Sequence, residues 1–264
     1  MPRGSKAITT GGDSFSAAHI TLAQFNTILS RYDATITSAS KPKPEPLTSL
    51  DSWRRHELPG LITSRSPPHM EKAEVYRLVD CKLKRGKTRP ILRLIDANPP
   101  AFVTSTTTTA FAHKDLKSSF TALLALKGVG PATASYLLAA HRCPNIPVFS
   151  DEAFRWVVHS GDWNAKIKYD EKEYWEFYGK VKDVAERLSV TLDEVERVGF
   201  VLGKEATTTP VAGKARERAN KAAGIEEPPS SRKRKIAAEE KPPPAKKPTT
   251  TTITTRRSGR LRKQ

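Results

Sequence analysis

The sequence contains little cysteine and no long apolar run. Only two of its 264 residues are cysteines, Cys81 and Cys143, and they lie far apart in the chain. Two thiols cannot ligate a four-cysteine iron–sulfur cluster, and their spacing is not that of a zinc site. Because the sequence shows no signal peptide, we expect reduced thiols in an intracellular protein. No apolar run has the length of a transmembrane helix, so we expect no membrane partner.

The apolar content is also low, and the charge is strongly positive. Hydrophobic residues make up 37% of the chain, which is low for a protein that is globular from end to end. The formal net charge of +17 indicates a polyanionic partner. Residues 204–264 contain 17 Lys and Arg against 6 Asp and Glu, which gives +11 of this charge. The remaining +6 lies in residues 1–203, so the body of the chain is basic too.

Composition sets a boundary after Gly203. Large apolar residues almost vanish there, and Lys, Pro, Thr and Ala replace them. Such a segment cannot bury enough apolar surface to offset its ordering entropy, so we predict a disordered basic tail over 204–264 and a disordered N-terminus over 1–12. The tail contains a basic run typical of a nuclear localisation signal, formed by Arg232, Lys233, Arg234 and Lys235. We therefore expect a nuclear protein with a nuclear import receptor among its partners.

Residues 13–203 show the apolar periodicity of helices, and no segment shows convincing strand alternation. Thr21 with Gln24 and Thr191 with Glu194 have the spacing of capping boxes. We predict an all-α domain over 13–203. The expected helices begin near Thr21, Pro90 and Asp151 and cover His69–Lys84, Leu116–Leu124, Ala132–Ala140, Glu171–Leu188 and Thr191–Gly203. Within the domain, the Pro-rich segment Thr37–Pro46 reads as an extended surface linker, and the Thr-rich run Thr104–Thr109 as a loop or a poor helix.

The segment that bears most on function is a helix–turn–helix pattern around two glycines. Apolar residues up to Leu126 are followed by Lys127, Gly128, Val129 and Gly130, and Pro131 opens the next helix. Two glycines allow positive φ and close approach of another molecule. Free amides at the start of a helix bind anions. In a basic protein, a DNA phosphate is the natural ligand.

This pattern resembles the hairpin of the helix-hairpin-helix DNA glycosylase superfamily, which reads Leu-Pro-Gly-Val-Gly and continues into a helix containing Ala. Here Lys127 replaces the usual proline and adds a cation beside the phosphate. The resemblance implies DNA as the partner, with contacts from Lys127, Gly128, Val129, Gly130 and Thr133. It implies no small-molecule cofactor, although such hairpins can hold a monovalent cation on backbone carbonyls. The alternative from the residues alone is an ordinary helix–glycine–helix turn.

The resemblance also points to a catalytic acid. In the superfamily, an extended Pro-Val segment leads into an aspartate at the start of the next helix, a position that Asp151 occupies after Pro147 and Val148. A carboxylate there would stabilise the positive charge that develops on the sugar when an N-glycosidic bond breaks. Glu152 is the alternative acid. Two residues separate Pro-Val from the acid, and Ala153 stands where the family often has histidine. A helix cap is the competing reading for Asp151.

Bifunctional members of the superfamily carry a lysine two residues after the second hairpin glycine, where this sequence has Ala132. An enzyme of this kind would therefore be monofunctional, without a Schiff-base step by that route. The alternatives are a non-catalytic DNA-binding module and a nuclear adaptor whose hairpin meets protein.

A basic segment adds candidate phosphate contacts at Lys84, Arg85, Lys87 and Arg89, against the alternative of a cationic helix end. Among the tryptophans we expect Trp163 to lie on the surface, and Trp156 and Trp175 to pack in the core. No histidine has the spacing of a metal site, and we expect no metal.

Overall fold

The computed structural model describes residues 15–41 and 45–208, and these form helices joined by short loops, without a β-strand. The predicted all-α class is confirmed for this part of the chain. The predicted disordered N-terminus, residues 209–264 of the predicted tail and the Arg232–Lys235 run lie outside the described residues. The predicted start of the tail is wrong, because residues 204–208 are helical. In chain order the helices are α1 (Leu22–Leu29), α2 (Tyr32–Ala39), α3 (Leu47–Ser52), the π-helical turn η1 (Trp53–Glu57), α4 (Leu58–Thr63), α5 (Lys72–Arg85), α6 (Leu92–Asp96), α7 (Pro100–Ala112), α8 (Leu116–Leu123), α9 (Pro131–Arg142), α10 (Asp151–Val157), α11 (Glu171–Leu188) and α12 (Leu192–Thr208).

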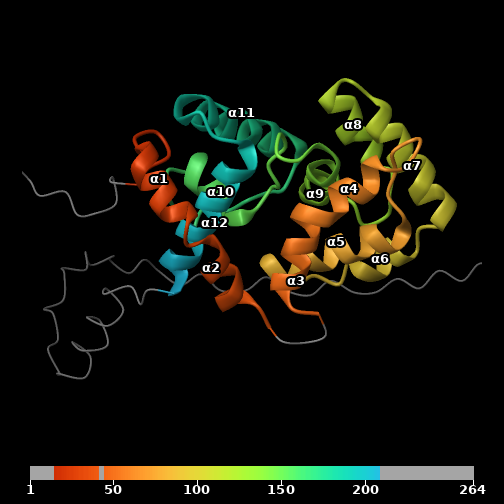
Figure 1. Cartoon of the computed structure of the whole chain (residues 1–264), viewed down its shortest axis with the longest axis horizontal. Helices are drawn as coiled ribbons and strands as arrows, with labels where there is room; N and C mark the ends of the chain where they lie inside the picture. The colour runs from red at the N-terminus through yellow and green to blue at the C-terminus, as the bar shows by residue number, and fades with distance from the viewer. Residues whose placement is uncertain (1–14, 42–44, 209–264) are drawn as a thin grey trace, which may run out of the picture. The chain divides into compact units, whose positions relative to one another are not determined.

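The helices form two groups that do not follow the chain order. α1 and α2 pack against α12, which also contacts α10 and α11, so the first and last helices of the described chain lie side by side (Figure 1). The middle of the chain forms the second group, in which α9 contacts α4, α5 and α8. Residues distant in sequence therefore meet where α5, α9, α10 and α12 come together.

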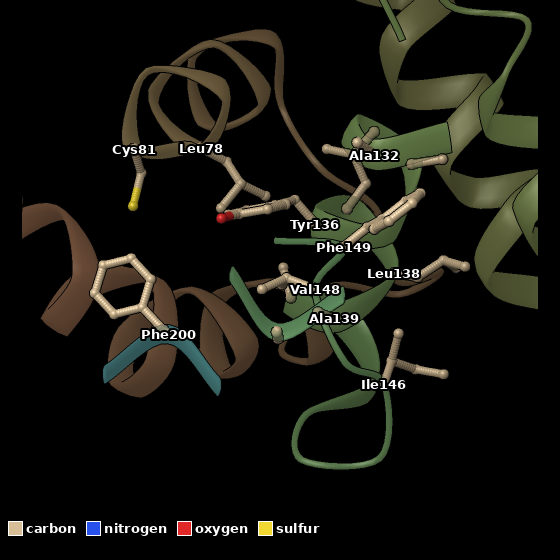
Figure 2. Packing of buried hydrophobic residues seen from close by; sticks show 14 of the residues in the cluster. Leu78, Cys81, Ala132, Tyr136, Leu138, Ala139, Ile146, Val148, Phe149 and Phe200 are labelled. Atoms are coloured by element: carbon tan, nitrogen blue, oxygen red, sulfur yellow. The ribbon is translucent and has the colours of Figure 1, made fainter. Parts of the chain in front are cut away.

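A shared core joins the two groups. Figure 2 shows Leu78 and Cys81 on α5 facing Tyr136 of α9 and Phe200 of α12. Each of these four side chains is at most 2% exposed. Burial of apolar surface on this scale is the main force that fixes one helix against another. The C-terminal half of α5 is thus held against the middle of α9 and of α12.

The last two described helices test the predictions most directly. α11 spans Glu171–Leu188, as predicted, and the capping box at the start of α12 is present, with reciprocal bonds of 2.8 and 3.2 Å between Thr191 and Glu194. The prediction that this helix ends at Gly203 is wrong, because α12 continues to Thr208. A Cβ at Gly203 would lie 2.5 Å from the Glu152 Cβ. The glycine is therefore required for close packing of α12 on α10 and not as a helix stop.

The Thr-rich run, for which the sequence predicted a loop or a poor helix, forms part of a regular helix. Thr104–Thr109 lies inside α7, whose Val103, Ala110 and Phe111 are buried. The Thr107 hydroxyl donates to the Val103 carbonyl at 2.8 Å and accepts from the Met70 amide at 3.0 Å. Burial and hydroxyl hydrogen bonds outweigh the weak helix propensity of threonine.

Two further expectations need correction. The start of the expected linker, Thr37–Ala39, ends helix α2, and Pro46 precedes α3, while residues 42–44 lie outside the described residues. Trp163 is half-buried rather than a surface residue, with a ring atom 3.1 Å from the position that a Cβ at Gly203 would take. Trp156 is 2% exposed, as expected of a core residue.

Candidate functional site

The predicted hairpin forms between α8 and α9, and its two glycines have different roles. Gly128 has φ +80°, and a Cβ there would lie 2.9 Å from the Leu94 Cβ, so both conformation and space require glycine. Gly130 has an extended backbone as N-cap of α9. Nothing lies within 4 Å of the position that its Cβ would take. Packing within the chain does not require glycine at 130, and this position is open to a molecule from outside.

The turn presents free backbone donors at the start of α9. The Val129 amide donates to the Leu126 carbonyl, and the carbonyl of Gly130 accepts from two amides of the first turn. Within the described residues, the amides of Gly128, Gly130 and Ala132 have no protein acceptor. Pro131 has no N–H and suits the first helical position. Free amides at a positive helix end are an anion-binding arrangement.

A buried asparagine that sequence reasoning missed holds the hairpin in place. Asn98, 2% exposed, donates to the Lys127 carbonyl at 3.0 Å and accepts from the Lys127 amide at 2.9 Å. The Lys127 side chain is exposed. Asn98 satisfies both backbone groups of the residue before Gly128, and it fixes the turn relative to α6.

We expect Asn98→Ala to lower the free energy of unfolding by about 1–3 kcal/mol, because it leaves buried backbone groups of Lys127 unpaired. Urea unfolding followed by circular dichroism measures this. Asn26→Ala, on the exposed face of α1, is the matched control and should change stability by no more than about 0.5 kcal/mol. Equal effects of the two substitutions would show that Asn98 does not hold the turn.

The hairpin opens into a cleft that also contains the predicted acid. The cavity has a volume of about 180 Å³. It lies between the C-terminal end of α5, the starts of α9 and α10, and Tyr169. Its lining includes the predicted site residues Gly128, Gly130, Thr133, Asp151, Glu152, Lys87, Arg89 and Arg85. The fold thus brings together three segments that the sequence analysis selected separately.

Asp151 is the first residue of α10 but does not cap it. The cap is Ser150, whose hydroxyl accepts from the Ala153 amide. The Asp151 carboxylate accepts hydrogen bonds from the Tyr169 hydroxyl, at 2.9 and 2.8 Å, and its side chain is 17% exposed. The Lys87 ammonium lies 3.7 Å from Oδ2 of Asp151. The competing reading of Asp151 as a plain cap does not fit this geometry.

Tyr169 is a second residue that sequence reasoning missed. It has φ 62°, a left-handed conformation that is uncommon for a tyrosine. Residues held in such conformations cluster at functional sites. Burial, followed by the hydrogen bond with Asp151 and its charge, raises the pKa of Tyr169 to about 12. The hydroxyl therefore remains a donor at neutral pH and orients the carboxylate. No sequence signal links Tyr169 with Asp151, because the pairing depends on the loop between α10 and α11.

Glu152, the alternative acid, is held by α12. Its Oε1 lies 2.7 Å from the Lys204 ammonium, and its side chain packs against Gly203. The cationic partners of Asp151, Lys87 and Arg155, both lie farther away, at 3.7 Å. Asp151 is therefore the acid held less tightly by a cation.

The side chains of the basic segment lie in different places, some at the cleft and one in the core. Lys87 is 67% exposed, and the Arg89 guanidinium lies 4.9 Å from the ring centre of Tyr169. Lys84 bonds to Asp80 at 2.6 Å and does not line the cleft. Arg85 is 2% exposed and is not placed for the predicted phosphate contact. In the hairpin, Val129 and Thr133 are buried as well, so only the Lys127 side chain there extends into solvent.

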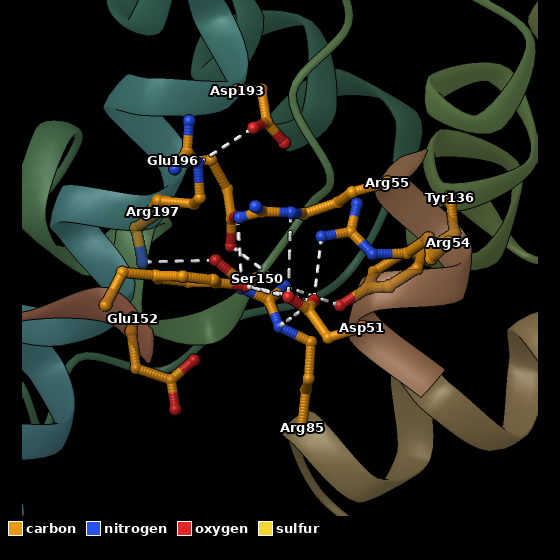
Figure 3. A network of polar contacts seen from close by, with 12 residues as sticks. Asp51, Arg54, Arg55, Arg85, Tyr136, Ser150, Glu152, Asp193, Glu196 and Arg197 are labelled. Atoms are coloured by element: carbon orange, nitrogen blue, oxygen red, sulfur yellow. Dashed lines mark hydrogen bonds and ion pairs between the residues drawn. The ribbon is translucent and has the colours of Figure 1, made fainter. Parts of the chain in front are cut away.

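The role of Arg85 is internal. Figure 3 shows it reaching from α5 into a polar network. Its guanidinium donates to both oxygens of Glu196 at 3.1 Å and to the hydroxyls of Tyr136 and Tyr32 at 3.0 and 3.2 Å. Glu196 is fully buried. This ion pair joins the end of α5 to α12 directly behind the cleft.

The described residues contain neither a metal site nor a membrane span. Among the described residues, no group of three His, Cys, Asp or Glu side chains is arranged to hold a metal ion. No described helix has the length and apolarity of a membrane span. The chain matches no protein-family model, no curated protein and no solved structure.

Proposed function

We propose that this chain is a DNA-binding helix-hairpin-helix protein that cleaves the N-glycosidic bond of a damaged or mispaired nucleotide. The observation that carries the proposal is the position of Asp151. Its carboxylate lies in the cleft that the hairpin glycines Gly128 and Gly130 also line. One molecule that places a phosphate on the hairpin amides can thus bring the neighbouring sugar toward the acid.

The chemistry follows from the residues of the cleft. A nucleotide must leave the duplex before its glycosidic bond becomes accessible. As that bond breaks, positive charge develops on the sugar, and the Asp151 carboxylate, oriented by Tyr169, stabilises it. The same carboxylate can orient the attacking water. Lys87 and Arg89 at the rim, with Lys127 on the hairpin, supply positive charge for the phosphates on either side.

Two observations favour a second candidate, a non-catalytic DNA-binding module. Both Asp151 oxygens already accept hydrogen bonds from Tyr169, and Ala153 stands where the superfamily often has histidine. In this alternative the cleft binds a phosphate or an extruded nucleotide without cleavage. A nuclear adaptor that binds protein through the hairpin is the third possibility. Nuclear localisation through Arg232–Lys235 is part of all three.

The deciding experiment incubates the full chain with duplexes that each contain one altered base: uracil, an alkylated purine, an oxidised purine or a mismatch. We expect an abasic product on at least one duplex, revealed as strand cleavage after alkali. Salt-sensitive binding to DNA without product on any duplex would favour the non-catalytic module. Absence of DNA binding would reject both.

Gly130→Glu tests whether the hairpin is the DNA anchor. Because the position is open, the substitution should leave the fold intact, while its carboxylate repels a phosphate at the amides. We expect DNA affinity to fall by at least about tenfold, the equivalent of one lost charge-assisted hydrogen bond. Fluorescence anisotropy measures this. Gly179→Glu on α11 makes the same charge change in equally open space and is the control. Unchanged binding by Gly130→Glu would place the DNA elsewhere.

A further inference from the structure

The cleft contains an amine that the proposed hydrolysis does not use. Lys82 lies on α5, one turn before its end, and its partly buried side chain lines the cleft together with Asp151 and Ala132. Within the described residues, its ammonium makes no hydrogen bond or ion pair. Its neighbours on the same helix are paired, Lys84 with Asp80 and Arg85 with Glu196. Lys82 is thus a lysine in the cleft without a structural partner.

The surroundings of Lys82 favour its neutral form. Burial is the largest cause and lowers the pKa of Lys82, the positive charge of Arg89 lowers it further, and Asp151 opposes both. A lysine with a lowered pKa has a larger fraction of free amine at neutral pH than a surface lysine. Such amines are nucleophiles toward carbonyl carbons. Both the position of the Lys82 side chain in the cleft and its lowered pKa therefore suit a nucleophile.

We propose that Lys82 is a nucleophilic amine that forms an imine with the aldehyde of a base-free deoxyribose held in the cleft. This inference rests on the proposed function, whose product is such a sugar. The sequence predicted no Schiff-base step by the hairpin route, because Ala132 stands where the superfamily's bifunctional members have lysine. In the fold, a lysine from a different helix lines the same cleft as Ala132. The protein then has a strand-cleaving activity in addition to base removal.

The reaction balances without any further reagent. The Lys82 amine adds to C1′ of the ring-opened sugar, and the aldehyde oxygen leaves as water, which gives the imine. Loss of the C2′ proton to the Asp151 carboxylate supplies the electron pair that forms the C2′–C3′ double bond. The C3′–O bond breaks, and the 3′ phosphate leaves with the downstream strand. Water then hydrolyses the imine, which releases the unsaturated aldehyde and restores the amine.

The test traps the imine on a preformed abasic site, so it does not depend on base excision. The full chain is incubated with an abasic-site duplex and sodium cyanoborohydride, and the covalent adduct is mapped by mass spectrometry. We expect the adduct on Lys82, and its loss in Lys82→Gln. Lys182→Gln on exposed α11 is the control that removes one lysine elsewhere. A folded Lys82→Gln protein that gives as much adduct, or an adduct mapped to other lysines, overturns the proposal.

A second measurement removes the dependence on DNA binding. The chain is treated with 2-deoxyribose 5-phosphate and cyanoborohydride, and labelling of each lysine is followed against pH. Lys82 should react faster than surface lysines near neutral pH, since each unit by which a lysine pKa lies lower gives about tenfold more free amine. Labelling of Lys82 at the rate of surface lysines overturns the proposal. Lys82 labelling without base excision rejects only the glycosylase, whereas excision without Lys82 adducts rejects only the imine.

Discussion

Asp151→Asn should reduce the rate of base excision by about 100- to 1,000-fold, the usual effect of removing a group that stabilises developing charge. The substitution keeps the shape of the side chain and removes its charge. Because Ser150 caps α10, the helix keeps its cap. Single-turnover assays with excess protein, on the duplex that gives most product, separate this step from product release. DNA affinity should change little, since the hairpin amides and the rim cations remain.

The control for this experiment is Asp183→Asn on the exposed side of α11, which makes the same chemical change outside the cleft. Tyr169→Phe adds a second readout, because it keeps the ring beside Arg89 and removes only the hydroxyl that orients Asp151. It should reduce excision less than Asp151→Asn does. Full excision by Asp151→Asn would reject the acid, and Glu152 would then be the next residue to test.

The features of this site that the sequence predicts are those formed by residues adjacent in the chain. The hairpin was readable because helix end, turn and helix start are adjacent in the chain, and Gly128 and Gly130 mark the turn. Asp151 was readable only through resemblance. Asn98 and Tyr169 were not readable, since their partners Lys127 and Asp151 lie 29 and 18 residues away and no local pattern encodes either pair.

For the basic segment, the helical spacing of the residues predicts which side chain is buried, whereas a count of charges does not. Counting charges makes Arg85 and Lys87 equivalent. In an α-helix, however, residues four and seven apart share a face, and Arg85 follows Cys81 by four and Leu78 by seven. Since Leu78 and Cys81 are apolar and buried, the phase places Arg85 toward the core. Lys87 lies beyond the end of α5 and escapes this constraint.

The helical segment 47–63, to which the sequence analysis assigned no helix, illustrates a different difficulty. Buried Asp51 and Arg54 interrupt its apolar face, and Pro59 lies within it. The π-helical turn over 53–57 resolves the conflict, because the Leu58 amide donates to the Trp53 carbonyl, five residues back. Pro59, which has no N–H, then lies in the first turn of the next helix, α4. A single helical period therefore does not fit the whole segment.

Glu196→Ala should lower the free energy of unfolding by about 3–5 kcal/mol, the cost of removing one partner of a buried ion pair, because Arg85 then keeps only the more distant Asp51 as an anionic partner, at 3.9 Å. The side chains of Arg85 and Glu196 are 2% and 0% exposed, so the pair is buried on both sides. Guanidinium unfolding measures the loss. Glu186→Ala, which removes an exposed acid from α11, is the control and should change stability by at most about 0.5 kcal/mol.

A double variant separates the ion pair from simple packing. The loss of stability in Glu196→Ala has one possible cause in the charge of Arg85, which no longer has Glu196 beside it. In that case, Arg85→Met combined with Glu196→Leu should be more stable than Glu196→Ala alone. The reason is that apolar pairs of similar volume often replace buried ion pairs at little cost. If lost packing causes the lower stability, the free energy of unfolding of the double variant should be no higher than that of Glu196→Ala. The distinction bears on function, since Arg85 ends α5, and Lys82 and Lys87 reach the cleft from that end. A double variant that regains stability but not excision would show that this ion pair positions the cleft rather than merely stabilising the fold.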